Sequence, residues 1–245
     1  MAIERPVKFS NWEPTEEEIK NGTWQLSDLP HQSEIGGYRG TLTREFVRDT
    51  FDPVCDERSI AWTLVWGYPN GRIQTSRPNM KKAAHSAPAV AEAVEALRKE
   101  KAIPAHEILQ RIHDVSEGIG PSTSSKIAYF ADLRAREGQC LILDARVISS
   151  ILYNRFDQLR PLIRKMLPHP PASYKCLGQQ IVDAQKRQQA MYGEYVHQMA
   201  KLAQRRGVTP DILEAFLFAN SPPSTTMTAI LDEWDNIRGK SRRRK

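Results

Sequence analysis

Residues 112–156 decide the fold of this chain and read IHDVSEGIGPSTSSKIAYFADLRAREGQCLILDARVISSILYNRF. Apolar residues recur at helical spacing on both sides of a glycine-rich centre, Gly118-Ile119-Gly120-Pro121-Ser122. Glycines at this spacing favour a tight turn, and Pro121 suits the first position of a helix, where its missing N–H costs nothing. The stretch therefore predicts a helix, a glycine hairpin and a second helix.

A short apolar run, Leu141-Ile142-Leu143, follows the second helix and ends in Asp144. Aspartate is a preferred N-cap, because its side chain accepts hydrogen bonds from the free N–H groups at a helix start. Apolar residues then return at helical spacing, namely Val147, Ile148, Ile151 and Leu152. We therefore expect Asp144 to begin a third helix, and capping alone would be its commonest role.

Together, the hairpin and the aspartate suit a reaction at a sugar in a polymer that also carries phosphates. A Gly-x-Gly turn at a helix start presents bare backbone N–H groups to a phosphate. Lys126 on the following helix would add positive charge. A carboxylate held nearby can stabilise positive charge that develops on a sugar.

At these residues the chain resembles the helix-hairpin-helix DNA glycosylase superfamily, whose members carry a similar glycine hairpin followed by an apolar run that ends in aspartate. The matching pieces are Glu117-Gly118-Ile119-Gly120 and Ile142-Leu143-Asp144. Glu117 stands where the family often has proline, and the spacing to Asp144 is longer than usual. The pattern is similar to bacterial members described as 8-oxoguanine-glycosylase-like. It is also similar to a phage-defence glycosylase that removes α-glucosylated 5-hydroxymethylcytosine from phage DNA.

The resemblance implies an enzyme that flips a modified base out of double-stranded DNA and cuts the bond between base and deoxyribose. Asp144 would be the catalytic carboxylate, which stabilises the sugar cation and orients the attacking water. The DNA backbone would be held by the hairpin and the helix after it. The residues in question are Gly118, Ile119, Gly120, Ser122 and Lys126.

The residue at the position of Ser122 divides the family. Members that also nick the strand have lysine there, which attacks the sugar as an amine and forms a Schiff base. A serine hydroxyl cannot do so, and we therefore expect a monofunctional enzyme that uses water and leaves an abasic site. Lys126, one helical turn further on, is the alternative amine.

Aromatic side chains are the candidates for stacking on the flipped base or wedging into the gap that it leaves. These candidates are Trp62, Trp66, Tyr68, Tyr129 and Tyr153. Aromatic residues at helical or strand spacing belong more often to the core.

Composition narrows the class of protein. The 245 residues carry a formal net charge of +6, which favours a polyanionic partner such as DNA. The three cysteines, Cys55, Cys140 and Cys176, form no metal-binding pattern, so we expect reduced thiols and no metal. The mechanism that the resemblance implies requires no cofactor. No apolar run could span a membrane and the N-terminus lacks signal-peptide features, so the expected location is the cytoplasm. Nothing points to a protein partner.

We expect a mainly α fold with two helical lobes and a cleft between them. Residues 1–80 would contribute to the second lobe, 81–160 would form the hairpin core with the catalytic aspartate, 161–238 would form C-terminal helices, and 239–245 would be a basic tail. The pattern at 60–66 fits a strand or a buried helical turn. Residues 161–171, bounded by prolines, suggest a linker.

Several functions remain open at this point. The first is a monofunctional glycosylase, with α-glucosylated 5-hydroxymethylcytosine of phage DNA as the preferred substrate and antiviral defence as the role. The second is a repair glycosylase for 8-oxoguanine or alkylated bases. A non-catalytic helix-hairpin-helix DNA-binding module is the third. A helical adaptor with a basic surface is the weakest, and salt-independent DNA binding would favour it.

Overall fold

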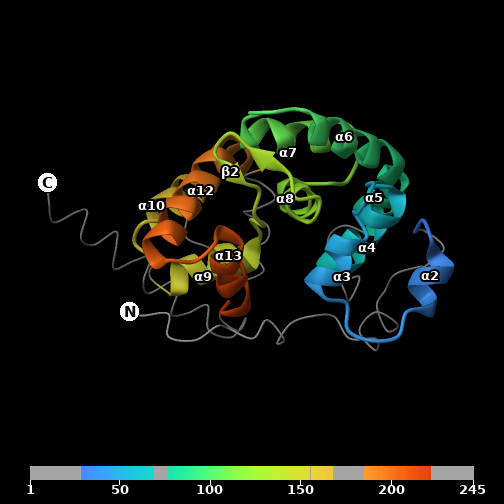
Figure 1. Ribbon diagram of the computed structural model, residues 1–245, viewed down its shortest axis with the longest axis horizontal. Helices are drawn as coiled ribbons and strands as arrows, with labels where there is room; N and C mark the ends of the chain where they lie inside the picture. The colour runs from blue at the N-terminus through green and yellow to red at the C-terminus, as the bar shows by residue number, and fades with distance from the viewer. Residues whose placement is uncertain (1–28, 69–76, 155, 168–184, 222–245) are drawn as a thin grey trace, which may run out of the picture. The chain divides into compact units, whose positions relative to one another are not determined.

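The computed structural model describes residues 29–68, 77–154, 156–167 and 185–221 (Figure 1). Within these residues the chain forms helices joined by short connections and one two-stranded antiparallel sheet. The prediction of a mainly α fold is therefore confirmed. Among the helices of the described residues, none combines the length and the apolar character that crossing a bilayer requires.

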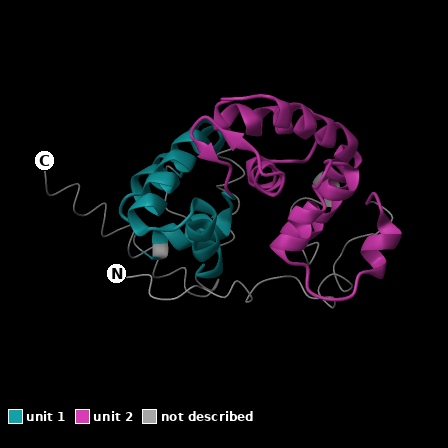
Figure 2. Ribbon diagram, viewed as in Figure 1, with its two compact units in different colours: residues 1–9, 142–245 teal, residues 10–141 magenta. Residues whose placement is uncertain are grey.

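The chain divides into two compact units (Figure 2). Residues 10–141 form the first, which we call the N-terminal unit. Residues 142–245 together with 1–9 form the second, which we call the C-terminal unit. The expected glycine hairpin lies in the N-terminal unit and Asp144 lies in the C-terminal unit.

The N-terminal unit is built around one helix that is buried on all sides. Its elements are α2 (Gln32–Gly37), α3 (Arg44–Asp49), α4 (Glu57–Gly67), α5 (Arg77–His85), α6 (Ala87–Lys99), α7 (Ala105–Asp114), α8 (Pro121–Phe130), β1 (Arg134–Ala135) and β2 (Gly138–Gln139). Helix α4 packs against α3, α5, α6 and α8. Every residue from 59 to 66 is buried, so no polar face marks this helix.

Local sequence decides that residues 57–67 are helical. The side chain of Asp56 accepts a hydrogen bond from the Ser59 N–H at 2.9 Å, and Asp56 and Ser59 form a capping box. This start settles the ambiguity at 60–66 in favour of a helix. On α3, Thr43 caps in the same way by accepting from the Phe46 N–H at 3.1 Å.

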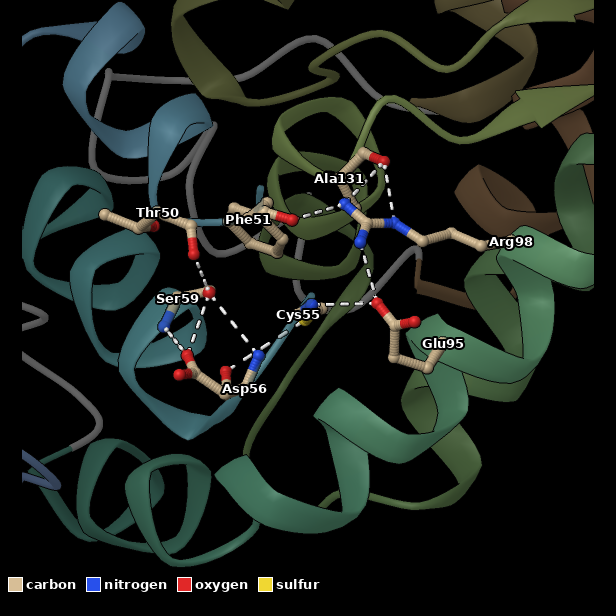
Figure 3. A network of polar contacts seen from close by, with 8 residues as sticks. All are labelled: Thr50, Phe51, Cys55, Asp56, Ser59, Glu95, Arg98 and Ala131. Carbon is tan, nitrogen blue, oxygen red and sulfur yellow. Dashed lines mark hydrogen bonds and ion pairs between the residues drawn. The ribbon is translucent and has the colours of Figure 1, made fainter. Parts of the chain in front are cut away.

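Arg98 on α6 joins the connection between α3 and α4 to the end of α8 (Figure 3). Its guanidinium donates to the Phe51 carbonyl at 2.9 Å, to the Ala131 carbonyl at 3.4 Å and to the Glu95 carboxylate at 2.7 Å. The same Glu95 carboxylate accepts from the Cys55 N–H at 2.8 Å. One charged pair thus satisfies three backbone groups, two in the connection between α3 and α4 and one at the end of α8.

Replacing Arg98 with methionine should lower the free energy of unfolding by about 2 kcal/mol, because two carbonyls lose a charged donor and Glu95 loses its partner. Methionine keeps most of the aliphatic stem, so the loss reports the guanidinium. Denaturant unfolding measures the effect. The control is Arg134→Met, at a side chain that is 71% exposed and paired with Asp132, where a change below about 0.5 kcal/mol is expected. Equal stabilities for the two variants would contradict this reading.

The C-terminal unit contains α9 (Ala145–Tyr153), α10 (Arg160–Met166), α12 (Gln185–Arg206) and α13 (Pro210–Ala219). Helix α9 packs against α10 and α13, and α12 packs against α10 and α13. Helix α10 corrects the expected linker after residue 160. Pro161 stands in the first turn of that helix, where proline is tolerated, so the proline there marks a start and not a break.

Candidate active site

The hairpin between α7 and α8 exposes a run of backbone amides. Gly118 has φ +89°, a conformation that L side chains rarely adopt, and Gly120 is the N-cap of α8. The N–H groups of Thr123 and Ser124 are bonded to the Gly120 carbonyl at 2.9 Å. By contrast, the N–H groups at 118, 119, 120 and 122 donate no hydrogen bond to any residue in the described part of the chain. The turn therefore offers unused donors at a helix start.

Neighbouring residues hold this turn in shape. The His113 Nδ1 lies 2.7 Å from the Ile119 carbonyl oxygen, and the Ile119 side chain is buried. The Glu117 N–H donates to the Ser86 hydroxyl at 3.1 Å, and the Glu117 carboxylate pairs with Lys82 at 2.8 Å. That pairing lowers the pKa of Glu117, although both side chains are well exposed and the pair adds little stability.

Replacing Gly118 with alanine should cost about 1–2 kcal/mol of stability, since an L residue is strained at this positive φ. A relaxed turn would also misplace the amides, so DNA affinity should fall in the same variant. Denaturant unfolding and fluorescence anisotropy with labelled duplex measure the two effects. Gly37→Ala is the matched control, because a Cβ there meets nothing within 4 Å and no positive φ is involved. Wild-type stability and affinity in Gly118→Ala would contradict the role of the turn.

One polar cluster lies beside the hairpin and consists of Tyr68, Ser122, Thr123 and Lys126. The Lys126 Nζ donates to the Ser122 hydroxyl at 3.0 Å and lies 6.0 Å from the centroid of the Tyr68 ring. The Tyr68 and Thr123 hydroxyls are 2.5 Å apart. Lys126 is only 3% exposed, and its stem lies so close to Gly67 that a Cβ there would approach the Lys126 Cδ to 3.2 Å. The structure therefore brings the two residues at the candidate nucleophile positions into direct contact.

The five aromatic candidates differ in exposure. Trp62 and Trp66 are fully buried, and Tyr129 is 3% exposed. Trp62 packs edge-on against Phe46, and its indole N–H donates to Glu34 at 3.1 Å. Tyr68 keeps part of its surface exposed. Tyr153 lies in α9, and its side chain is outside the described residues.

Two arginines that were not predicted as site residues lie over the rings of Trp66 and Tyr129. The Arg44 Cζ is 5.3 Å from the Trp66 ring centroid and 5.4 Å from that of Tyr129, and the Arg48 Cζ is 5.0 Å from that of Tyr129. The spacing of four residues on α3 places both arginines on one side of that helix. The sequence indicates, through this spacing, that the two arginines share a side of the helix, but it does not reveal which aromatic rings they contact.

Asp144 is the N-cap of α9 and is held rigidly. Its Oδ1 accepts hydrogen bonds from the N–H groups of Arg146 at 3.0 Å and Val147 at 3.1 Å. Asp144 is buried, with 7% of the residue exposed. The Tyr195 hydroxyl donates to the Ile142 carbonyl at 2.9 Å, which fixes the apolar run before the cap. The predicted cap at Asp144 is therefore confirmed.

The N-terminal unit contains a second aspartate cap with almost the same geometry. The backbone of Asp56 has φ −128° and ψ −178°, and that of Asp144 has φ −126° and ψ −179°. Each side chain accepts from the N–H three residues further on. Capping by itself therefore does not distinguish the two aspartates, which makes Asp56 a matched control for Asp144.

Within the described residues, neither a reactive thiol nor a metal site is found. Cys55 and Cys140 are buried free thiols, and burial raises the pKa of Cys55 to about 12. Cys176 lies outside the described residues. No group of three histidine, cysteine or carboxylate side chains in that part of the chain is placed to hold a metal ion.

Comparison with known proteins then assigns the family. The model of the family described as "Putative 8-oxoguanine DNA glycosylase OGG-like protein" matches residues 5–218. The chain belongs to this family. Membership of the OGG-like family supports a DNA glycosylase-like function and implies DNA as the substrate. The match includes both the hairpin and Asp144. No curated protein and no solved structure matches the chain.

Proposed function

We propose that this OGG-like protein is a monofunctional DNA N-glycosylase, which excises a modified base with water and leaves an abasic site. The observation that carries the proposal is the turn at 118–122, with its unused amides at the start of a ten-residue helix. Backbone N–H groups there suit a phosphate, because their partial positive charge adds to that of the helix terminus. Nucleotide flipping requires such a grip on the strand.

Asp144 is the proposed catalytic carboxylate. Hydrolysis of the glycosidic bond builds positive charge on the sugar, and a carboxylate of fixed orientation stabilises that charge without reorganising. The two amides that bind Oδ1 keep the side chain in one orientation.

Water is the proposed nucleophile because neither Ser122 nor Lys126 offers an accessible amine. Ser122 occupies the position of the lysine in strand-nicking relatives, and its hydroxyl is bonded to Lys126. Lys126 as a whole residue is 3% exposed, so the arrangement leaves its amine little room to reach a sugar carbon. Proton transfers to and from water would then rest on Asp144.

The preferred substrate in this proposal is α-glucosylated 5-hydroxymethylcytosine of phage DNA, with an antiviral role in the cytoplasm. The resemblance to a phage-defence glycosylase supports this choice. The second candidate is 8-oxoguanine, which the family description favours. Tyr68 is the proposed contact to the base or to the gap that it leaves, since it combines an aromatic ring with exposed surface next to Lys126.

A base-release assay tests the proposal. The protein is incubated with duplexes that contain 8-oxoguanine, an alkylated purine or uracil, and with phage DNA that carries hydroxymethylated or glucosylated cytosine. Free bases are then identified by mass spectrometry. Release from glucosylated DNA alone supports the preferred substrate, and release of 8-oxoguanine alone supports the second candidate. Tight, salt-dependent binding without any release would favour the non-catalytic DNA-binding module and overturn the proposal.

A further inference from the structure

A pair of arginines on α3 covers two buried aromatic rings of the N-terminal unit. Helix α3 packs against both α4, which carries Trp66, and α8, which carries Tyr129. Both rings are almost fully buried, and the Arg44 and Arg48 side chains, each partly exposed, lie over them. The Arg44 and Arg48 Cζ atoms lie 5.0–5.4 Å from the ring centroids, which is within the range of a cation–π contact.

Within the described residues, no acceptor engages the Arg48 guanidinium. Its Nε is buried without a hydrogen-bond partner, and the side chain forms no ion pair within the described residues. The acidic neighbours Glu45 and Asp49 are exposed and form no ion pair with that part of the chain either. The Arg48 side chain is partly exposed and no acceptor in the described residues engages its guanidinium, so a ligand that supplies acceptor oxygens fits this position.

We propose that Arg44 and Arg48 form a binding site for a phosphate of the DNA backbone, in addition to the hairpin. The ligand class follows from the donors: two guanidiniums offer planar, forked N–H groups that match the oxygens of a phosphate. The contact with Tyr129 holds Arg48 in place before DNA arrives, which reduces the entropy lost on binding. The assignment to DNA rests on the proposed function.

The position of the pair relative to α8 agrees with a second contact on the same strand. Ser122, Lys126 and Tyr129 are spaced at i, i+4 and i+7, so they lie on one side of α8. Seven residues of α-helix span about 10 Å, which is roughly three nucleotide steps of one strand. The hairpin begins this helix and the arginine pair covers a ring near its end, at a distance that one DNA strand can bridge.

The network around Arg98 supports this placement. It ties the connection after α3 to the end of α8 through the Phe51 and Ala131 carbonyls (Figure 3). Tyr129 is two residues from Ala131, and Arg48 is three residues from Phe51. The segments that carry the arginines and the ring are thus fixed to each other within the N-terminal unit.

The test measures DNA binding of the full-length double variant Arg44→Gln/Arg48→Gln over a range of KCl concentrations, by fluorescence anisotropy with a labelled duplex. The affinity should fall about tenfold, and the slope of log K against log salt should become shallower by about 0.9 for each phosphate that the variant no longer neutralises. The control Arg134→Gln, at an exposed arginine of the same unit, should keep both values. A double variant with wild-type melting temperature, affinity and salt slope would overturn the site.

A second variant keeps the test informative if the double variant does not fold. Arg48→Lys retains the charge but loses the planar fork, so the affinity should fall while the salt slope stays the same. Unchanged affinity in Arg48→Lys would overturn the role of the fork. Inorganic phosphate at constant ionic strength is the third probe. Stabilisation of the wild type by phosphate, with DNA binding unaltered in the variants, would assign the site to a free anion and overturn the proposal.

Failure of this site and failure of the proposed function can be told apart. If the wild type releases the base and the double variant keeps the wild-type salt slope, the arginine phosphate site is overturned and the glycosylase function stands. Salt-dependent binding that needs both arginines, without base release from any substrate, would support the phosphate site and remove the glycosylase.

Discussion

Replacing Asp144 with asparagine is expected to reduce base release by about 10²–10⁴-fold while stability stays within about 1 kcal/mol of the wild type. Asparagine caps helices as well as aspartate does, because its side-chain oxygen can accept from the same two N–H groups at 146 and 147. What the variant lacks is the negative charge that the sugar cation requires. DNA affinity should change little. Single-turnover base release and denaturant unfolding provide the two readouts.

Asp56→Asn is the control for this variant. The two aspartates have nearly equal backbone angles and each accepts from the N–H three residues on, so the same substitution is made in two comparable caps. Base release by Asp56→Asn should stay close to that of the wild type. Equal losses in both variants would mean that activity depends on capping and fold integrity, and full activity in Asp144→Asn would remove that residue from the reaction.

Replacing Ser122 with lysine should convert the enzyme to one that forms a Schiff base with the abasic sugar and nicks the strand. The new amine would stand at the position of the lysine in strand-nicking relatives. The ammonium of Lys126, now 3.0 Å from the Ser122 hydroxyl, would disfavour a second positive charge and so lower the pKa of the new amine. Ser122 is partly exposed, so the longer side chain has a path toward solvent.

Borohydride trapping of the protein–DNA adduct measures this gain. The wild type should give no trapped adduct, and Ser122→Lys should give a covalent product with abasic DNA. Ser122→Met is the control, since it has similar length without an amine. The Ser122→Lys/Lys126→Met variant shows which amine reacts. Trapping by the wild type that disappears in Lys126→Met would make Lys126 the nucleophile and contradict the monofunctional mechanism.

Local signals in the sequence were sufficient for the hairpin and for the cap. The glycines, Pro121 and Asp144 act on their own backbone, through allowed φ values, a missing N–H and a short side chain that bonds nearby amides. Those effects do not depend on distant residues. The starts of α8 and α9 therefore follow from the sequence, and the structure has both as expected.

Packing between distant segments could not be predicted in the same way. Residues 59–66 are buried on all sides, so they lack the polar face that marks a helix by periodicity, and only the cap at Asp56 indicates one. The burial of Lys126 depends on Gly67, which is far away in sequence. The positions of the two arginines on α3 likewise depend on contacts with Trp66 and Tyr129, which belong to two other helices.

Strand breakage before and after alkali tests the central claim most directly. The wild-type protein is incubated with an end-labelled duplex that contains the base identified by the release assay, and half of each sample is heated in alkali. If water is the nucleophile, the strands stay intact in the untreated half and break only after alkali, in an amount equal to the base released. Breaks in the untreated half, together with a borohydride-trapped adduct, would contradict a mechanism in which water is the nucleophile.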